Sequence, residues 1–499
     1  MPTLDRVAAR LGDEARHQCH AAIDDAPLLA MTTDLHEEYG SAATARLRIA
    51  QRLRAALERE RIRRGLAVVD ALATIDARHA RQVARLRVAE GYVAAIRTAQ
   101  AHLVCDGLLT PRQLDGRYTW QTSLALLAVQ RREQLVPRGR LDGETRAVLA
   151  DDSRAVAYRA ALRVLRERVI AATGLIEDGS AGAGHQLVLG QALGSPAFGQ
   201  VAGHAPLPGA APDLVSAATE AAARALGWLD PAATSAALAA LPPRVAVRLP
   251  PLPRYHAAVM DLTVEIDRGD VWYDRTPRRH RVERRPALIL YASDAGQRIP
   301  LVRWPTTIGG WKEERRSRWR TVDTWMESPV GPRVWRDLYV APSWLPPANT
   351  PDRELVRTIG RPPELAADLL GPSYRSAYGL VMLIHERDVV TRRGVVRQDE
   401  RIRTHGSGSI ASIFDGASHG CHRLPPLLAL RLAGFILDHR GHVRHGDERT
   451  AYTRVVRYRG RFPVRITTRG YHVELTPPVP VTVLPGRIRS TRQTPYRSR

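Results

Sequence analysis

The chain contains few cysteines and no long apolar run. Cys19, Cys105 and Cys421 are the only cysteines in 499 residues, and their odd number and wide spacing predict no disulfide framework. No apolar stretch reaches the length of a membrane-spanning helix. The first residues also lack the apolar segment that is typical of a secretory signal. The sequence therefore predicts no membrane anchor and shows no visible leader.

Lysine is nearly absent, because Lys312 is the only one. Lys and Arg nevertheless number 74 against 51 Asp and Glu, which gives a formal net charge of +23. An excess of Arg over Lys this extreme is typical of a GC-rich genome, and the arginines are spread along the chain with one local maximum between Arg315 and Arg320. A spread charge is weak evidence for nucleic acid, and any anionic polymer fits it equally well. We expect no nucleic-acid partner.

The richest cluster of chemical groups lies between His405 and Leu424. It combines one thiol with three imidazoles and several small residues: His405, Gly406, Ser407, Ser418, His419, Gly420, Cys421 and His422. Pro425 and Pro426 follow, and the apolar pattern up to Leu437 predicts a buried helix. Cys421 is thus predicted to lie on a glycine-containing turn just before a helix N-terminus.

This predicted placement suits a nucleophilic cysteine. A helix N-terminus and a neighbouring imidazole both favour the thiolate. The backbone N–H groups of Gly420 and Cys421 are predicted to be available to an oxyanion. A nucleophile, a base and a pair of donors are what acyl transfer through a thioester requires.

The same stretch resembles the active-site signature of the L,D-transpeptidases, the YkuD-type catalytic domain. That signature is His-Gly-Thr/Ser, a spacer, then Ser-His/Ser-Gly-Cys-x-Arg-Leu/Met, which corresponds here to residues 405–407 and 418–424. His422 stands where many relatives carry an aliphatic residue. Residues 339–347 and 378–385 are similar to two further segments of that family.

The resemblance implies a role for each motif residue. Cys421 is the implied nucleophile and His405 the implied base, with the Gly406 carbonyl orienting its ring. The oxyanion and loop residues are Gly420, His419, Gly406, Ser407 and Ser418, and the substrate-binding residues are Arg423, Tyr378 and Gly379. Arg423 would bind a substrate carboxylate or, alternatively, form a structural ion pair. His385 is expected to be a strand residue rather than a catalyst.

The implied activity is acyl transfer on peptidoglycan stem peptides. The thiol attacks the carbonyl at the L-centre of meso-diaminopimelate and releases D-Ala. A second amine then resolves the thioester, which forms a 3-3 crosslink or attaches a partner. Carbapenem-type lactams are implied inhibitors, and no metal or organic cofactor is implied. The resemblance places the protein in the cell envelope or periplasm, with roles in cell-wall organisation and cell shape.

Four alternatives remain at this stage. The first is an L,D-carboxypeptidase or amidase on the same scaffold, with water as the acceptor. The second is a non-catalytic cell-wall binding protein. The third is an inert buried cysteine, which leaves the surrounding Gly, Ser and His unexplained. The fourth is a structural zinc site, whose ligands would be crowded into residues 419–422 rather than spaced in pairs.

Residues 91–152 resemble a peptidoglycan-binding domain of the small three-helix type. The resemblance is carried by Asp115-Gly116-Arg117-Tyr118-Thr119-Trp120-Gln121-Thr122 and by a later Gly139, Asp142 and Thr145. Thr119 stands where the family usually has glycine. The alternative is a plain helical domain in which the Asp-Gly pairs form only turns.

We therefore predict a multidomain α+β protein with a helical N-terminal half and a mostly β catalytic domain. The predicted divisions are a helical region (1–90), the peptidoglycan-binding-like domain (91–152), a helical region with a Gly/Ala/Pro-rich linker (153–253), the catalytic domain (254–486) and a mobile basic tail (487–499). Residues 386–400 are predicted to extend a hairpin. Residues 462–475 and 479–483 are predicted to be two closing strands.

Overall fold

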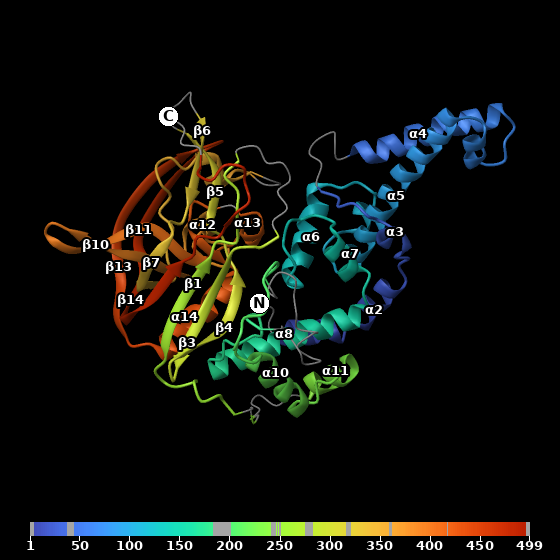
Figure 1. Ribbon diagram of the computed structural model, residues 1–499. Coiled ribbons are helices and arrows are strands. Elements are labelled where there is room, and N and C mark those ends of the chain that lie inside the picture. The colour runs from blue at the N-terminus through green and yellow to red at the C-terminus, as the bar shows by residue number, and fades with distance from the viewer. Residues whose placement is uncertain are drawn as a thin grey trace. The chain divides into compact units, whose positions relative to one another are not determined.

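The structure is a computed structural model that describes residues 4–36, 44–182, 201–240, 246, 248, 251–274, 283–315, 321–358, 362–416 and 418–495. The chain divides into two compact units (Figure 1). The first, the helical unit, comprises Met1–Leu165 and Ala223–Val247. The second, the sheet unit, comprises Arg166–Ala222 and Arg248–Arg499. A helical N-terminal half and a β-rich C-terminal half confirm the predicted α+β class.

The N-terminal half of the chain is built from helices. Their bounds are α1 Leu4–Leu11, α2 Glu14–Ala21, α3 Ala26–Leu29, α4 Ala45–Arg63, η2 Val69–Thr74, α5 Ala77–Cys105, η3 Pro111–Gln113, α6 Trp120–Arg132, α7 Gly143–Leu149, α8 Ser153–Thr173, α10 Leu214–Ala225 and α11 Pro231–Ala239. None of the described helices is both long and apolar enough to cross a membrane.

Helices α4 and α5 form an antiparallel hairpin within the region that the sequence predicts to be helical. Leu57 of α4 packs in one buried cluster with Val83 of α5, and Ala50 packs in a second cluster with Val93. Residues late in α4 thus pack against residues early in α5, so the two helices run in opposite directions. The buried residues where the two helices meet are apolar, so this hairpin is held mainly by apolar packing.

Two glutamines organise the region that resembles a peptidoglycan-binding domain. The Gln100 side chain accepts the Gly116 N–H at 2.9 Å and donates to the Arg117 carbonyl at 3.0 Å. The Gln130 side chain accepts the Gly139 N–H at 2.8 Å and donates to the Arg140 carbonyl at 2.8 Å.

Each glutamine also donates to a threonine hydroxyl. Gln100 bonds Thr122 at 3.3 Å, and Gln130 bonds Thr145 at 2.8 Å. The recurring Gln, Gly and Thr of the motif therefore satisfy buried polar groups inside the fold. Their presence has a structural explanation whether or not the surface binds a polymer.

The structure contains one disulfide, which the number and spacing of the cysteines did not imply. Cys19 in α2 and Cys105 at the end of α5 form a disulfide whose Cα atoms are 5.7 Å apart. The two residues are 86 positions apart in sequence, and only the packing of α2 against α5 brings them together. Cys421 is the one free cysteine.

The C-terminal half is built mainly from strands. Their bounds are β1 Asp261–Asp267, β2 Asp270–Val271, β3 Ala287–Asp294, β4 Gln297–Pro305, β5 Gly309–Arg315, β6 Thr321–Glu327, β7 Gly331–Val340, β8 Val356–Arg357, β9 Glu364–Leu365, β10 Val381–Thr391, β11 Gly394–Gly406, β12 His422–Leu424, β13 His442–Arg457, β14 Arg461–Val483 and β15 Arg487–Ile488. Among the described residues of this half the helices are η4 Asp352–Leu355, α12 Ala367–Leu370, α13 Ile410–Phe414 and α14 Pro426–His439.

Among the described residues the main sheet has nine strands in the order β12-β11-β10-β7-β14-β1-β3-β4, with β13 paired to β14. The β11–β12 and β1–β14 pairs are parallel, and the other pairs are antiparallel. Helix α14 covers one face of this sheet, where Leu432 and Ile436 are fully buried beside Leu290 and Leu383. The apolar pattern from Leu427 to Leu437 therefore predicted this helix correctly.

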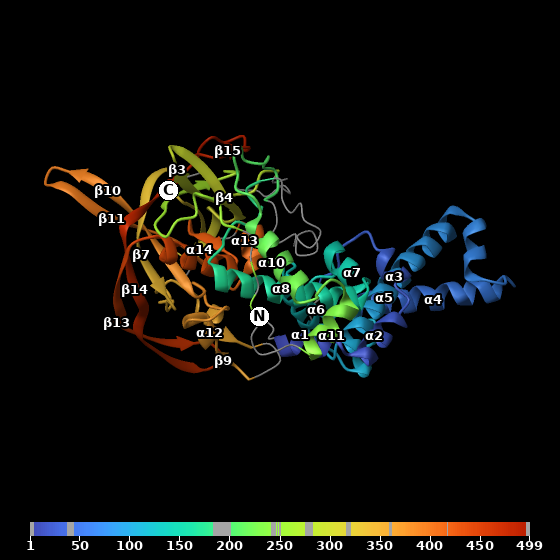
Figure 2. The same ribbon diagram turned by 90° about the horizontal axis from the view of Figure 1, so that it is seen from below.

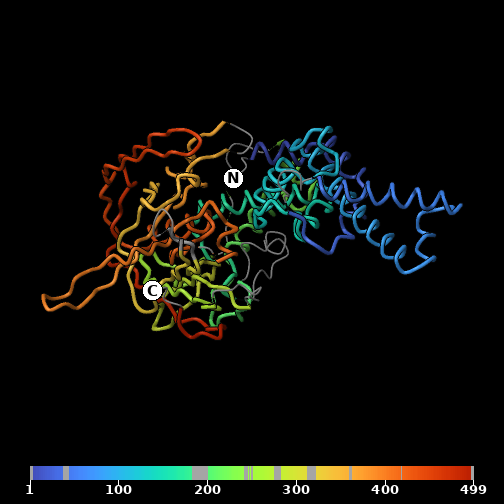
Figure 3. Tube along the Cα trace, turned by 90° about the horizontal axis from the view of Figure 1, so that it is seen from above, coloured from blue at the N-terminus to red at the C-terminus, as the bar shows by residue number. Residues whose placement is uncertain are grey.

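The predicted hairpin extension at 386–400 is present. Strands β10 and β11 pair from Met382 with His405 out to Thr391 with Gly394. Their paired ends project from the sheet as a two-stranded arm (Figure 2, Figure 3).

Two predictions for the end of the chain need correction. Residues 461–483 form one strand, β14, rather than two, because it continues through a register shift between Glu474 and Val479. Strand β13 was not anticipated. The predicted mobile tail begins with an ordered strand, because Arg487 and Ile488 pair with Asp270 and Val271.

Candidate functional site

Strands β11 and β12 bring the two halves of the motif together. They run parallel, with Thr404 opposite His422 and His405 opposite Arg423. Cys421 directly precedes β12. Because side chains alternate between the faces of a strand, Cys421, Arg423 and His405 are assigned to one face, and Thr404 and His422 to the other. The sequence-predicted nucleophile and base thus share a face.

The predicted helix N-terminus is not at the thiol. Strand β12 comes between Cys421 and α14, whose first residue is Pro426 and whose N-cap is Pro425. The favourable effect of a helix dipole is confined to the first turn. The expectation that this helix favours the thiolate is therefore wrong.

His405 is buried and neutral. Its Nδ1 lies 2.6 Å from the carbonyl oxygen of Gly406, so Nδ1 carries the proton and donates it. Burial, followed by the positive charge of Arg423, lowers the pKa of His405 to about 3, although the bond to Gly406 acts in the opposite direction. The imidazole therefore has an unprotonated Nε2 at physiological pH, as a general base requires.

Two residues of the predicted substrate-binding set also contact this ring or its support. The ring of Tyr378 meets that of His405 edge to face, with centroids 5.1 Å apart. Gly379 lies against the Gly406 peptide, since a Cβ atom at Gly379 would be 2.9 Å from the Gly406 Cα and 3.2 Å from its carbonyl oxygen. Gly379 is thus required for the close approach that holds the orienting carbonyl in place.

A set of hydroxyl groups fixes the turn that carries Cys421. Thr307 Oγ1 donates to the Cys421 carbonyl at 2.7 Å, and Ser418 Oγ donates to the same oxygen at 2.9 Å. The Arg423 N–H donates to Thr307 Oγ1 at 3.0 Å, and Thr306 Oγ1 donates to the Arg423 carbonyl at 3.0 Å. Thr306 and Thr307 were not predicted, because they are 114 to 117 residues away in sequence.

Gly420 has a backbone conformation that favours glycine. Its φ is +98°, and a Cβ there would be 2.8 Å from the Ile402 side chain and 3.0 Å from the Glu327 backbone. The remaining loop residues occupy different environments. Ser407 and Ser418 are buried, and the Ser407 N–H donates to the Leu424 carbonyl at 3.0 Å. His419 is exposed on the turn.

The thiol of Cys421 is not activated in this state. Burial raises its pKa above the ordinary value, while a hydrogen bond from the Arg403 backbone and the charges of Arg423 and Arg403 lower it only in part. Cys421 and His405 are therefore both neutral, rather than a thiolate and an imidazolium. The positive charges of these two arginines favour the thiolate form of Cys421.

Arg423 has a structural contact of its own. Its Nη1 donates to Ser412 Oγ at 2.9 Å, which ties β12 to α13. Burial lowers the pKa of Arg423, and the Cys421 thiolate form would raise it. The Arg423 side chain thus fixes β12 to α13, and its positive charge lowers the pKa of the Cys421 thiol.

His385 lies on the opposite face of the main sheet from His405. Its Nε2 accepts the Trp335 Nε1–H at 2.9 Å and lies 2.8 Å from Thr404 Oγ1. The His422 Nδ1 is 3.2 Å away. Burial lowers the pKa of His385 and, to about 3, the pKa of His422, so both rings are neutral. This buried pair of rings therefore packs on the face of β11 and β12 that is opposite to His405.

No model of a known protein family matches the chain, and no curated protein matches it. Within the part of the chain that the structure describes, no three His, Cys, Asp or Glu side chains are grouped so as to hold a metal ion.

Proposed function

We propose that the sheet unit is a cysteine acyltransferase of the L,D-transpeptidase type that acts on peptidoglycan stem peptides. The observation that carries the proposal is the parallel register of β11 and β12. It places a neutral imidazole with an available Nε2 on the same face as the one free thiol. The motif resemblance supplies the substrate class.

The neutral resting pair suggests how the acylation half-reaction proceeds. His405 Nε2 removes the thiol proton as Cys421 Sγ attacks the carbonyl at the L-centre of meso-diaminopimelate. The backbone N–H groups of Gly420 and Cys421 are proposed to stabilise the oxyanion. The carbon–nitrogen bond then breaks, the His405 imidazolium protonates the departing D-Ala amine, and a thioester remains on Cys421.

The deacylation half-reaction reverses these roles. An amine from a second stem peptide attacks the thioester while His405 Nε2 takes its proton. The carbon–sulfur bond breaks, and the thiolate recovers the proton from the imidazolium. The result is a new amide, the 3-3 crosslink, and the starting thiol. Water in place of the amine would give a carboxypeptidase.

The Cys19–Cys105 disulfide supports the cellular setting of this proposal. Disulfides persist in oxidising compartments and are rare in the reducing cytosol. A protein that acts on the cell wall works in such a compartment. We therefore propose that the mature protein works in the cell envelope.

The proposal is tested by carbapenem labelling and by product analysis. The parent should gain one lactam mass on the Cys421 peptide and should form 3-3 crosslinked products from purified muropeptides. Cys421→Ala should do neither, whereas the double variant Cys19→Ala, Cys105→Ala should still be labelled. Products lacking only D-Ala would indicate the hydrolase instead. Labelling that survives Cys421→Ala would refute the assigned nucleophile.

A further inference from the structure

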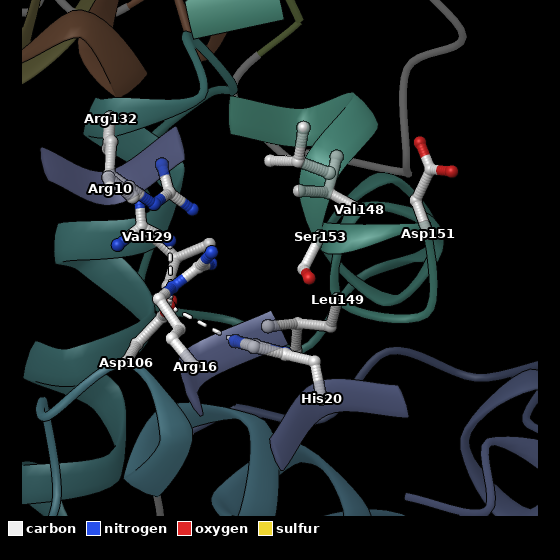
Figure 4. A pocket seen from close by; sticks show the side chains of 11 residues that line it. Arg10, Arg16, His20, Asp106, Val129, Arg132, Val148, Leu149, Asp151 and Ser153 are labelled. Atoms are coloured by element: carbon white, nitrogen blue, oxygen red, sulfur yellow. Dashed lines mark hydrogen bonds and ion pairs between the residues drawn. The ribbon is translucent and has the colours of Figure 1, made fainter. Parts of the chain in front are cut away.

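The buried charges around Asp106 in the helical unit are paired with one another. Asp106 accepts hydrogen bonds from Arg16 Nε at 2.7 Å and from Arg132 Nη2 at 2.6 Å, and its Oδ1 lies 3.2 Å from His20 Nε2 (Figure 4). The hollow beside these side chains has room for about one water molecule. This cluster therefore ties α2, α5 and α6 together and offers no space to a larger ligand.

The arm of the sheet unit is the opposite case, because it exposes apolar side chains. Strands β10 and β11 extend away from the main sheet and end in residues Val389–Val396, the arm tip (Figure 2). Val390, Val395 and Val396 are 82%, 65% and 51% exposed. Valines this close together form a patch, unlike the single apolar residues that are scattered over an ordinary surface. Such a patch marks a contact surface.

The register of the two strands places one valine pair on each face of the arm. Val389 is opposite Val396, and Val390 is opposite Val395. Because successive side chains of a strand point to opposite faces, the two pairs lie on different faces. A protein surface that packs against the arm from one side would leave the other pair in water. The boundary between lipid headgroups and acyl chains can surround both pairs at once.

The turn at the end of the arm carries positive charge alone. Arg392 and Arg393 lie in this turn, and both are exposed. No acidic residue occurs from Val389 to Val396. Arginines are attracted to an anionic lipid surface, and guanidinium groups bind phosphates with charge-assisted hydrogen bonds. The charge of the tip therefore complements that of anionic lipid.

The tip is held in shape and is short. Thr391 Oγ1 donates to the Gly394 carbonyl at 2.8 Å, and the Arg393 N–H donates to Thr391 Oγ1 at 3.2 Å. Toward the sheet the valines give way to a polar pair, in which an Asp388 oxygen lies 3.6 Å from Arg397 Nε. Three extended residues span about 10 Å. The tip is therefore long enough to enter the headgroup layer and too short to cross the hydrocarbon core.

We propose that the tip of the arm attaches the sheet unit to the surface of an anionic lipid bilayer. The four valines enter the boundary between headgroups and acyl chains, and Arg392 and Arg393 bind lipid phosphates. Burial of the valines supplies an attraction that does not depend on charge, and the arginines confine the attachment to anionic lipid. The inference does not depend on the chemistry proposed for Cys421.

The test is flotation of the full chain with vesicles of mixed phosphatidylglycerol and phosphatidylcholine, compared with vesicles of phosphatidylcholine alone. The parent should float with the mixed vesicles only. Val390→Ser with Val395→Ser should weaken binding by about tenfold or more, because two apolar side chains no longer transfer from water into lipid. Arg392→Gln with Arg393→Gln should weaken it by about tenfold or more through the loss of attraction to the lipid phosphates.

Matched control variants remove the same groups elsewhere in the sheet unit. Val259 and Val443 are 77% and 51% exposed, and Val259→Ser with Val443→Ser should leave vesicle binding unchanged. Arg449→Gln with Arg465→Gln removes two exposed charges from β13 and β14 and should also leave it unchanged. The circular dichroism spectra of all four double variants should be that of the parent, because every replaced side chain is exposed.

A fluorescent label reports contact at the tip itself. In the Cys421→Ala background, Val395→Cys supplies the one free thiol, because Cys19 and Cys105 form a disulfide. A nitrobenzoxadiazole label there should brighten and shift to shorter wavelength when the mixed vesicles are added. The same label on Val443→Cys should do neither.

Three results would overturn the proposal. Failure of the parent to float with the mixed vesicles would favour a protein partner for the arm. Binding that is lost in the arginine variant and kept in the valine variant would show that charge alone is responsible. Equal losses in the tip variants and the control variants would show that the attachment does not involve the arm.

Discussion

Replacing Gly379 with alanine should disturb the support of His405 rather than the imidazole itself. Gly379 has a φ of +65°, and a Cβ there would be 2.9 Å from the Gly406 Cα, 3.0 Å from its carbonyl carbon and 3.2 Å from its carbonyl oxygen. All three are backbone atoms, so no flexible side chain can move aside. The Gly406 carbonyl that must shift is the one that accepts the His405 Nδ1–H.

The expected loss of stability has two parts. An alanine at positive φ costs about 1–2 kcal/mol. Forcing one more carbon into a packed site costs about 1–3 kcal/mol in addition. The free energy of unfolding of Gly379→Ala should therefore fall by about 2–5 kcal/mol.

Gly209 provides a matched control. It belongs to the same unit and also has a φ of +65°, but a Cβ there would have nothing within 4 Å. Gly209→Ala should thus lose only the stability that the positive φ costs. The difference in unfolding free energy between the two variants measures the cost of the steric contact at Gly379. The difference should be about 1–3 kcal/mol.

Urea unfolding followed by tryptophan fluorescence measures both variants, because Trp304 and Trp335 are fully buried in the core of the sheet unit. Turnover of Gly379→Ala should fall by about 100-fold, the cost of misplacing a catalytic group by about 1 Å, while Gly209→Ala should retain parental turnover. Equal destabilisation of the two variants would refute the argument from the close approach. Parental turnover in a destabilised Gly379→Ala would refute the link to His405.

Three further predictions concern pH and binding. Iodoacetamide should alkylate Cys421 slowly near neutral pH and faster in alkali, because burial raises the pKa of the thiol. His405→Ala should abolish turnover but leave this pH profile of alkylation unchanged, because His405 is neutral and its removal takes no positive charge from the site. A profile displaced to higher pH in His405→Ala would indicate an imidazolium–thiolate pair instead. The folded pKa of His422 lies at about 3 and its ordinary value at 6.5, so its contribution to stability is present above pH 6.5 and lost as pH falls toward 3. His422→Ile should therefore show a smaller loss of unfolding free energy between pH 7.5 and 5 than the parent does, and an equal loss would contradict the assignment. Full-length Cys421→Ala should sediment with insoluble peptidoglycan. Adding Trp120→Ala and Leu124→Ala, which together remove an exposed i,i+4 apolar pair of α6, should reduce the bound fraction. An unchanged bound fraction would exclude this face of α6 as the binding surface.

The sequence by itself determined several local elements and singled out the candidate reactive groups. The apolar pattern from Leu427 to Leu437 specified α14, because that helix buries one stripe of side chains. The motif resemblance alone predicted that His405 and Cys421 act together, and this stays a prediction. The expectation that the Gly406 carbonyl orients the imidazole agrees with the observed hydrogen bond, since this contact lies between adjacent residues.

Only the tertiary structure decided how the reactive groups are charged and what surrounds them. The pKa values of Cys421 and His405 depend on burial, which no local pattern reports, and burial outweighs the expected activation of the thiol. The Cys19–Cys105 disulfide and the hydrogen bonds from Thr306 and Thr307 join residues far apart in the chain. Such contacts follow from how helices and strands pack, and spacing along the sequence carries no record of that packing.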